Sequence, residues 1–168
     1  MNTALKLPST DPSPKASQKM KEKILLVDDD PAIRQLLTRL LTEEGYIVVS
    51  AANGVEAFEL VCKAQFDLAL LDLNMPVMDG WDAFEQITTK IPLLPIIVIT
   101  ARPNQLFPAL ASGTGALMEK PLDLPKLFET IETLLKEPLE ARIARMAGRP
   151  SEFRYVPPNT GETPRHTG

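Results

Sequence analysis

Residues 24–37 read ILLVDDDPAIRQLL and span a complete passage from strand to helix. The apolar run from Ile24 to Val27 has the length of a buried strand, and three acids follow it directly. Pro31 suits the first turn of a helix, because a helix start leaves its first N–H groups without partners. Apolar residues then recur with helical spacing until Gly45. This stretch therefore predicts a buried strand, an acidic loop and an amphipathic helix.

The same alternation continues along the chain and predicts a parallel sheet. Short apolar runs indicate further strands at residues 47–51, 68–71, 96–99 and 116–119. Helical patterns follow at 53–61, 81–87, 106–111 and 124–135, and the pattern at 106–111 is the weakest because prolines and glycines surround it. Continuous apolar runs suit strands that are covered on both faces, as crossover helices require. The expected fold class is α/β, with a doubly wound five-stranded parallel sheet and helices on both faces.

A polar landmark closes four of the apolar runs: Asp28-Asp29, Asp72, Thr100 and Lys120. The carboxyl ends of parallel strands meet at one edge of a sheet, so these side chains are expected to converge there. Clustered carboxylates repel one another unless a metal or a lysine neutralises them, and Mg²⁺ prefers such oxygen ligands. A carboxylate in this setting can attack phosphorus. The sequence thus predicts a hard-cation and phosphoryl site.

Four motifs occur in series: LLVDDDPAIRQLL at 25–37, LALLDLNMPVMDGWDAFEQI at 68–87, IIVITA at 96–101 and MEKP at 118–121. In this order and spacing they resemble the receiver domain of bacterial two-component response regulators, over about residues 23–136. The resemblance implies a flavodoxin-like sheet with strand order 2-1-3-4-5. The chain is expected to be a stand-alone, CheY-like receiver, because the residues after Lys136 are too few and too rich in proline for an effector domain.

The resemblance also implies a role for each motif residue. Asp72 corresponds to the phosphoacceptor, Thr100 to the switch hydroxyl and Lys120 to the phosphate-binding lysine, with a cis bond between Lys120 and Pro121. The implied cofactor is Mg²⁺, and its implied protein ligands are Asp28, Asp29, Asp72 and the backbone carbonyl of Asn74. One departure concerns Leu117, three residues before the lysine, where the family commonly has an aromatic residue.

The expected function is that of a phosphoacceptor regulator and not of a classical enzyme. Asp72 would take a phosphoryl group from a histidine kinase or phosphotransfer protein in a Mg²⁺-dependent reaction and thereby alter contacts with an unknown downstream protein. A homodimer is left open. The alternative is a non-switching receiver-fold scaffold that binds a partner constitutively through the Leu117 face or residues 138–156. The complete set of acidic, hydroxyl and lysine landmarks argues against this alternative.

The composition excludes several classes of partner and location. A formal net charge of −4 offers no basic footprint, so direct nucleic-acid binding is not expected. The single cysteine, Cys62, cannot form an internal disulfide, and no stretch has the ~20 apolar residues of a membrane span. No secretory signal pattern is present at the N-terminus. The expected location is therefore the cytoplasm, without membrane contact.

Three segments are expected along the chain. Residues 1–21 lack apolar periodicity and predict a disordered leader, residues 22–137 form the receiver domain, and residues 138–168 form a proline-punctuated tail. The tail has the pattern of a short helix at 139–147 and is expected to be disordered beyond it. Asp30 and Asp79 are expected to cap helices. Arg102 is expected either to reach over the site or to lie solvated in its loop.

Overall fold

The computed structural model describes residues 21–149 and 153–161. The strands are β1 (Lys23–Val27), β2 (Ile47–Ala51), β3 (Leu68–Asp72), β4 (Ile96–Thr100), β5 (Ala116–Glu119) and β6 (Arg154–Val156). The helices are α1 (Pro31–Glu43), α2 (Gly54–Lys63), α3 (Gly80–Lys90), α4 (Leu106–Ser112), α5 (Leu124–Leu135) and α6 (Leu139–Met146). The expected leader, residues 1–21, lies almost wholly outside the described residues.

The strands form one parallel sheet in the order β2-β1-β3-β4-β5-β6. The predicted order 2-1-3-4-5 is confirmed, but the predicted number of strands is wrong, because β6 extends the sheet to six. β6 has only three residues and lies between prolines, so its own sequence is too short a pattern to predict a strand. Its partner is the otherwise open edge of β5, with Leu117 opposite Tyr155.

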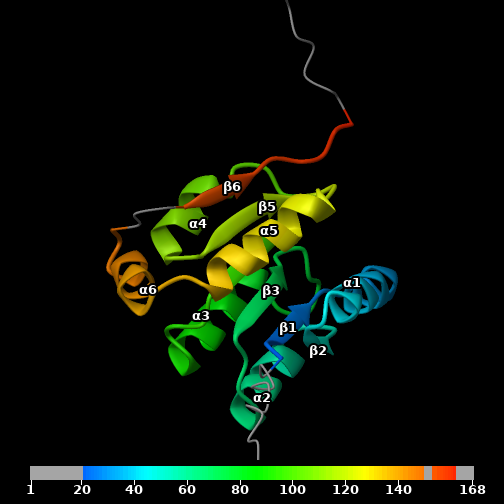
Figure 1. Ribbon diagram of the computed structural model, residues 1–168, viewed down its shortest axis with the longest axis horizontal. Coiled ribbons are helices and arrows are strands. Elements are labelled where there is room, and N and C mark those ends of the chain that lie inside the picture. Colours follow the sequence, from blue (N-terminus) through cyan, green and yellow to red (C-terminus); the bar gives the residue numbers. More distant parts are fainter. Residues whose placement is uncertain (1–20, 150–152, 162–168) are drawn as a thin grey trace, which may run out of the picture.

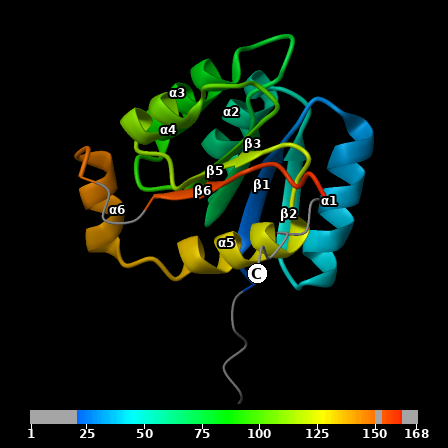
Figure 2. The same cartoon turned by 90° about the horizontal axis from the view of Figure 1, so that it is seen from above.

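Helices cover both faces of the sheet, with α1 and α5 on one side and α2, α3 and α4 on the other (Figures 1 and 2). Successive side chains along each strand point to opposite faces of the sheet, as the pleat requires. Leu25 of β1 packs in the core beneath α2 and α3, whereas Ile24 packs in the core beneath α1 and α5. All four residues after Lys23 in β1 are buried. None of the described helices is long and apolar enough to cross a membrane.

Side-chain caps fix the helix starts that follow the strands. Asp30 accepts hydrogen bonds from the backbone N–H groups of Ala32 and Ile33, and Asp79 accepts one from Trp81. The expected caps are thus confirmed. Each cap satisfies N–H groups that the first helical turn leaves unpaired, and it orients the loop that leads from the strand end into the helix. These loops carry most of the candidate site.

Two arginines of α6, Arg142 and Arg145, face the body of the domain. Arg145 is 4% exposed; its Nε donates to the Gly113 carbonyl at the end of α4 (2.9 Å), and its guanidinium pairs with Glu137. Arg142 donates to the carbonyls of Leu134 and Leu135 at the end of α5. Both arginines therefore cap helix C-termini, whose partial negative charge favours cations.

The tail is more ordered than the sequence indicates. The short helix predicted at 139–147 agrees with α6, but the expectation of disorder beyond it does not hold for Arg154–Val156, which form β6. Long-range contacts of Arg145 and the free edge of β5 hold this segment. A single sequence shows neither the location of a sheet edge nor the partner of a buried arginine.

We predict that Glu137→Gln lowers the free energy of unfolding by about 3 kcal/mol, because it leaves the buried Arg145 guanidinium without its carboxylate. Glu132→Gln is the matched control in α5, since Glu132 pairs with Lys136 in full solvent, and it should change stability by less than about 0.5 kcal/mol. Urea unfolding of both variants measures the difference. Equal effects would show that the Arg145 pair does not anchor α6.

Candidate acidic pocket at the strand ends

The fold brings the predicted landmarks together at one edge of the sheet. Asp28 directly follows β1, Asp72 ends β3, Thr100 ends β4 and Lys120 follows β5. These four strands are neighbours in the sheet and run in the same direction, so their C-terminal ends form one rim. Asp28, Asp72 and Thr100 are buried, whereas Asp29 is exposed.

Three carboxylates and one ammonium group form the centre of the pocket. One oxygen from each of Asp28, Asp29 and Asp72 can be chosen so that all three lie within 4.8 Å of one another. The Lys120 Nζ lies 2.8 Å from Asp72 Oδ2 and 3.4 Å from Asp28 Oδ2. Hard oxygen ligands at this spacing fit Mg²⁺, which is commonly held by one or two carboxylates, substrate phosphate and water.

Burial sets the electrostatics of this cluster. Burial raises the pKa of Asp28, and the charge of Asp72 adds to the increase, while the N–H of Asp30 and Lys120 oppose it. For Lys120, burial lowers the pKa, but the hydrogen bond to Asp72 and the charges of both aspartates outweigh this effect and leave the pKa raised. Lys120 therefore stays protonated at neutral pH, and the charged form of Asp28 is disfavoured.

Backbone turns hold the two buried carboxylates in place. The N–H of Asp30 donates to Asp28 Oδ1 (2.9 Å), and the N–H of Asn74 donates to Asp72 Oδ1 (2.8 Å). Arg34 Nη1 donates to the carbonyls of Asp28 and Asp29 at 2.7 and 3.0 Å. Sequence reasoning missed Arg34. Its place one turn beyond the Asp30 cap could have suggested that it reaches back to this loop.

Thr100 is tied to Asn74 by a bond that the sequence did not predict. The Thr100 hydroxyl donates to Asn74 Oδ1 (3.2 Å) and accepts from the N–H of Arg102 (2.9 Å). The N–H of Ala101 also donates to Asn74 Oδ1, at 3.2 Å. The Asn74 side chain thus orders the loop after β4 and engages the Thr100 hydroxyl, in addition to any role of its backbone carbonyl.

Two further predictions concern the rim of the pocket. Arg102 pairs with Asp79 in a partly exposed contact of 3.1 Å, so it is bonded within the loops beside the pocket. The N–H of Trp81, and then Arg102, lower the pKa of Asp79.

The bond between Lys120 and Pro121 is cis, as the resemblance implied. Leu117, at the position of the departure, is fully buried in the core beneath α2 to α4.

A doubly wound parallel sheet with acids and a lysine at the carboxyl ends of its strands defines a class of α/β domain that binds ligands at this rim. The family model of the response regulator receiver domain matches residues 24–132, and the chain belongs to this family. Receiver domains are signalling modules that bind Mg²⁺ at the acidic pocket, where this chain has its three aspartates.

Individual relatives agree with this assignment. The transcriptional regulatory protein GlrR of Escherichia coli K12 is 36% identical over 116 residues, which are 68% of this chain and 26% of GlrR. A CheY-like receiver domain protein from Methanospirillum hungatei has a TM-score of 0.65 and 32% identity, covering 68% of this chain and 94% of that chain. The response regulator TrrA of Thermotoga maritima, in complex with Mg(2+)-BeF, has a TM-score of 0.63 and 33% identity, covering 67% and 98%. This chain thus spans about a quarter of GlrR but nearly all of the two solved receivers.

We predict that Asp28→Asn raises the melting temperature by a few degrees in the absence of Mg²⁺, the shift expected for about 1 kcal/mol of relieved desolvation and repulsion. Because Asp28 binds its proton more tightly in the folded chain, wild-type stability falls as the pH rises from the ordinary Asp value of 3.8 through the raised one. The advantage of the variant should therefore be full above this window and absent below it. Melting curves at several pH values test this, and a lower melting temperature of the variant at neutral pH would contradict it.

Proposed function

We propose that Asp72 accepts a phosphoryl group from a histidine kinase or a phosphotransfer protein, and that the modified domain changes its contacts with a downstream protein. The observation that carries this proposal is the contact of Lys120 Nζ with the buried Asp72 carboxylate, inside a cluster of three aspartates. An ammonium group at this place can neutralise phosphoryl oxygens as charge develops on them. A mostly electrostatic site is sufficient for phosphoryl transfer.

The residues of the pocket have separate tasks in this reaction. A carboxylate oxygen of Asp72 forms the new bond to phosphorus while the bond from phosphorus to the donor nitrogen or oxygen breaks, and the donor group leaves. Lys120 stays protonated, and its positive charge neutralises the negative charge that develops on the phosphoryl oxygens. The Thr100 hydroxyl can bind a phosphoryl oxygen once it gives up its hydrogen bond to Asn74 Oδ1. This exchange links the modification to the loop after β4.

Asp28, Asp29, Asp72 and the backbone carbonyl of Asn74 would hold Mg²⁺, which when bound neutralises the phosphoryl oxygens. Two observations support this ligand set: the spacing of the three carboxylates, and the pKa of Asp28, which burial and then the charge of Asp72 raise, so that a nearby cation would favour the charged form. The similar TrrA is described in complex with Mg(2+)-BeF. Asp28 and Asp72 are buried, so the surrounding protein fixes their positions.

The domain limits and the partners remain part of the proposal. Residues 22–137 would be the phosphoacceptor unit, acting in the cytoplasm, and residues 138–161 an appended segment. GlrR is a transcriptional regulatory protein, and the match covers only 26% of its length, so the likeness concerns the receiver part alone. The net charge of −4 still favours a protein partner over direct contact with nucleic acid.

We predict that incubation with acetyl phosphate and Mg²⁺ adds the mass of one phosphoryl group to the chain, and that Asp72→Asn abolishes this gain. Asp79→Asn is the matched control, because Asp79 lies outside the cluster and asparagine can still cap α3. Intact mass spectrometry measures all three proteins. An unmodified wild type, or a modified Asp72→Asn protein, would contradict the proposed phosphoacceptor.

We predict that Mg²⁺ at about 10 to 100 times its Kd stabilises the wild type by about 1.4 to 2.7 kcal/mol, since it binds only the folded chain. Asp29→Asn should lose most of this gain. Asp30→Asn should keep it, because Asp30 caps α1 and asparagine serves equally well there. Melting temperatures with and without Mg²⁺ give the result, and an equal response of the two variants would remove Asp29 from the ligand set.

A further inference from the structure

The strand β6 occupies the edge of the sheet beside β5, where a chain ending at α5 would leave an open edge (Figure 1). Open edges present unpaired N–H and C=O groups to any extended chain. β6 pairs with β5 over only three positions, from Ala116 opposite Arg154 to Met118 opposite Val156. It is therefore a short strap over a potential binding edge.

Two anchors of this strap lie directly on either side of Lys120. Glu119, the preceding residue, interacts with the hydroxyl of the exposed Tyr155, and partial desolvation together with this carboxylate raises the pKa of that hydroxyl. Pro121, the following residue, accepts a hydrogen bond from the N–H of Asn159 at 2.9 Å. The strap is thus attached to the same short segment that carries the ammonium group of the pocket.

The other contacts of the strap do not involve the pocket. Arg154 pairs with Glu129 of α5 at 2.9 Å in an exposed contact, and Val156 is buried against the core that contains Met118. These contacts fix β6 to the body of the domain. A displacement of the segment around Lys120 would therefore strain the strap between two sets of anchors.

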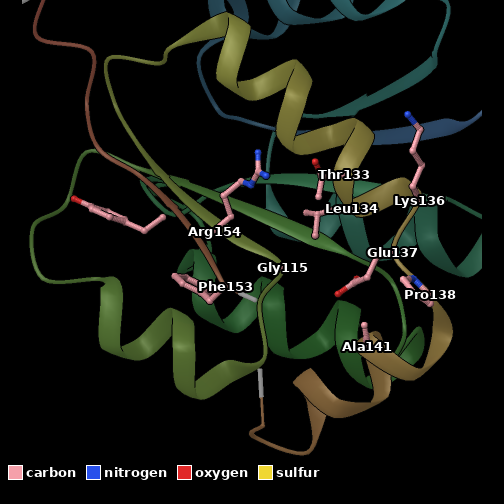
Figure 3. Close-up of a pocket in the computed structure, with 10 residues that line it drawn as sticks. Gly115, Thr133, Leu134, Lys136, Glu137, Pro138, Ala141, Phe153 and Arg154 are labelled. Carbon is pink, nitrogen blue, oxygen red and sulfur yellow. The ribbon is translucent and has the colours of Figure 1, made fainter. Parts of the chain in front are cut away.

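A pocket lies beside the beginning of β6, next to Phe153, which packs against the core beneath α2 to α4. A cavity of about 610 Å³ separates Phe153 and Arg154 from the end of α5 and the start of α6 (Figure 3). Its opposite wall includes Leu134, Glu137 and Ala141. Because β6 pairs over only three positions and two of its three residues are not buried, it belongs to the class of elements that open locally at low free energy.

We propose that β6 is a phosphorylation-sensitive strap, which loosens when Asp72 is modified and uncovers the edge of β5; this inference rests on the proposed function. A phosphoryl group would replace the carboxylate charge that Lys120 contacts with about two negative charges placed farther out. Lys120 follows this charge and carries Glu119 and Pro121 with it. The anchors beside Lys120 then move relative to those at Glu129 and Met118.

Hydrogen exchange followed by mass spectrometry on the full chain tests the strap. With acetyl phosphate and Mg²⁺, the peptide covering residues 153–159 should exchange at least about fivefold faster. A factor of about five corresponds to the lower end of ordinary coupling free energies between two sites. The peptide covering β2, at the opposite edge of the sheet, should not change. Intact mass of the same sample reports modification, and Asp72→Asn should remove the effect.

A second arm uses a variant that undocks the strap. Val156→Asp places a charge in a buried apolar position, and Val156→Thr is its milder control. Because undocking removes the strain that modification would otherwise place on the strap, the aspartate variant should accumulate modified protein to a larger fraction at equal donor concentration. A wild type that is modified without faster exchange at 153–159 would overturn the strap. A wild type that gains no mass would refute the proposed function, and the strap would fall with it because there would be no modification for the strap to respond to.

Discussion

The contact of Lys120 with Asp72 and Asp28 is the interaction on which the rest of the pocket depends. Two buried carboxylates beside a third acid would repel one another in a low-dielectric site, and the ammonium group makes this arrangement tolerable without making it favourable for Asp28. The cluster is thus kept in a state that gains from additional positive charge. The fold supplies the geometry, because β1, β3 and β5 run in parallel within one sheet and deliver these groups to one rim.

Most of the fold could be predicted from local patterns. The run from Ile24 to Val27, the cap at Asp30 and the helical spacing after Pro31 each favour the same structure, so they identify β1 and α1 without tertiary information. The convergence of Asp28, Asp72 and Lys120 followed from one topological rule about parallel strands. The short α4 was expected as the weakest helix, because prolines and glycines surround it, and the structure shows that Pro108 falls in its first turn, where no N–H partner is lost.

Apart from the local bonds of Arg34, the features that sequence reasoning missed depend on partners that are distant in the chain. β6 exists because β5 offers a free edge, since Tyr155 and its neighbours alone are too few to predict a strand. The bond from Thr100 to the Asn74 side chain joins two loops whose separation only the folded sheet determines. The burial of Arg145 is similar, since an arginine on an amphipathic pattern would ordinarily be assigned to the solvent side.

The buried arginines of α6 affect how this segment responds to ionic strength. Exposed ion pairs such as that of Arg39 with Glu43 are screened by salt, whereas Arg142 and Arg145 bond helix-end carbonyls and the sheltered Glu137. Salt therefore leaves α6 attached under conditions that weaken surface pairs. Attachment of α6 in turn shortens the chain that β6 must span to reach β5, so the edge strand keeps a high effective concentration in dilute and in saline solution alike.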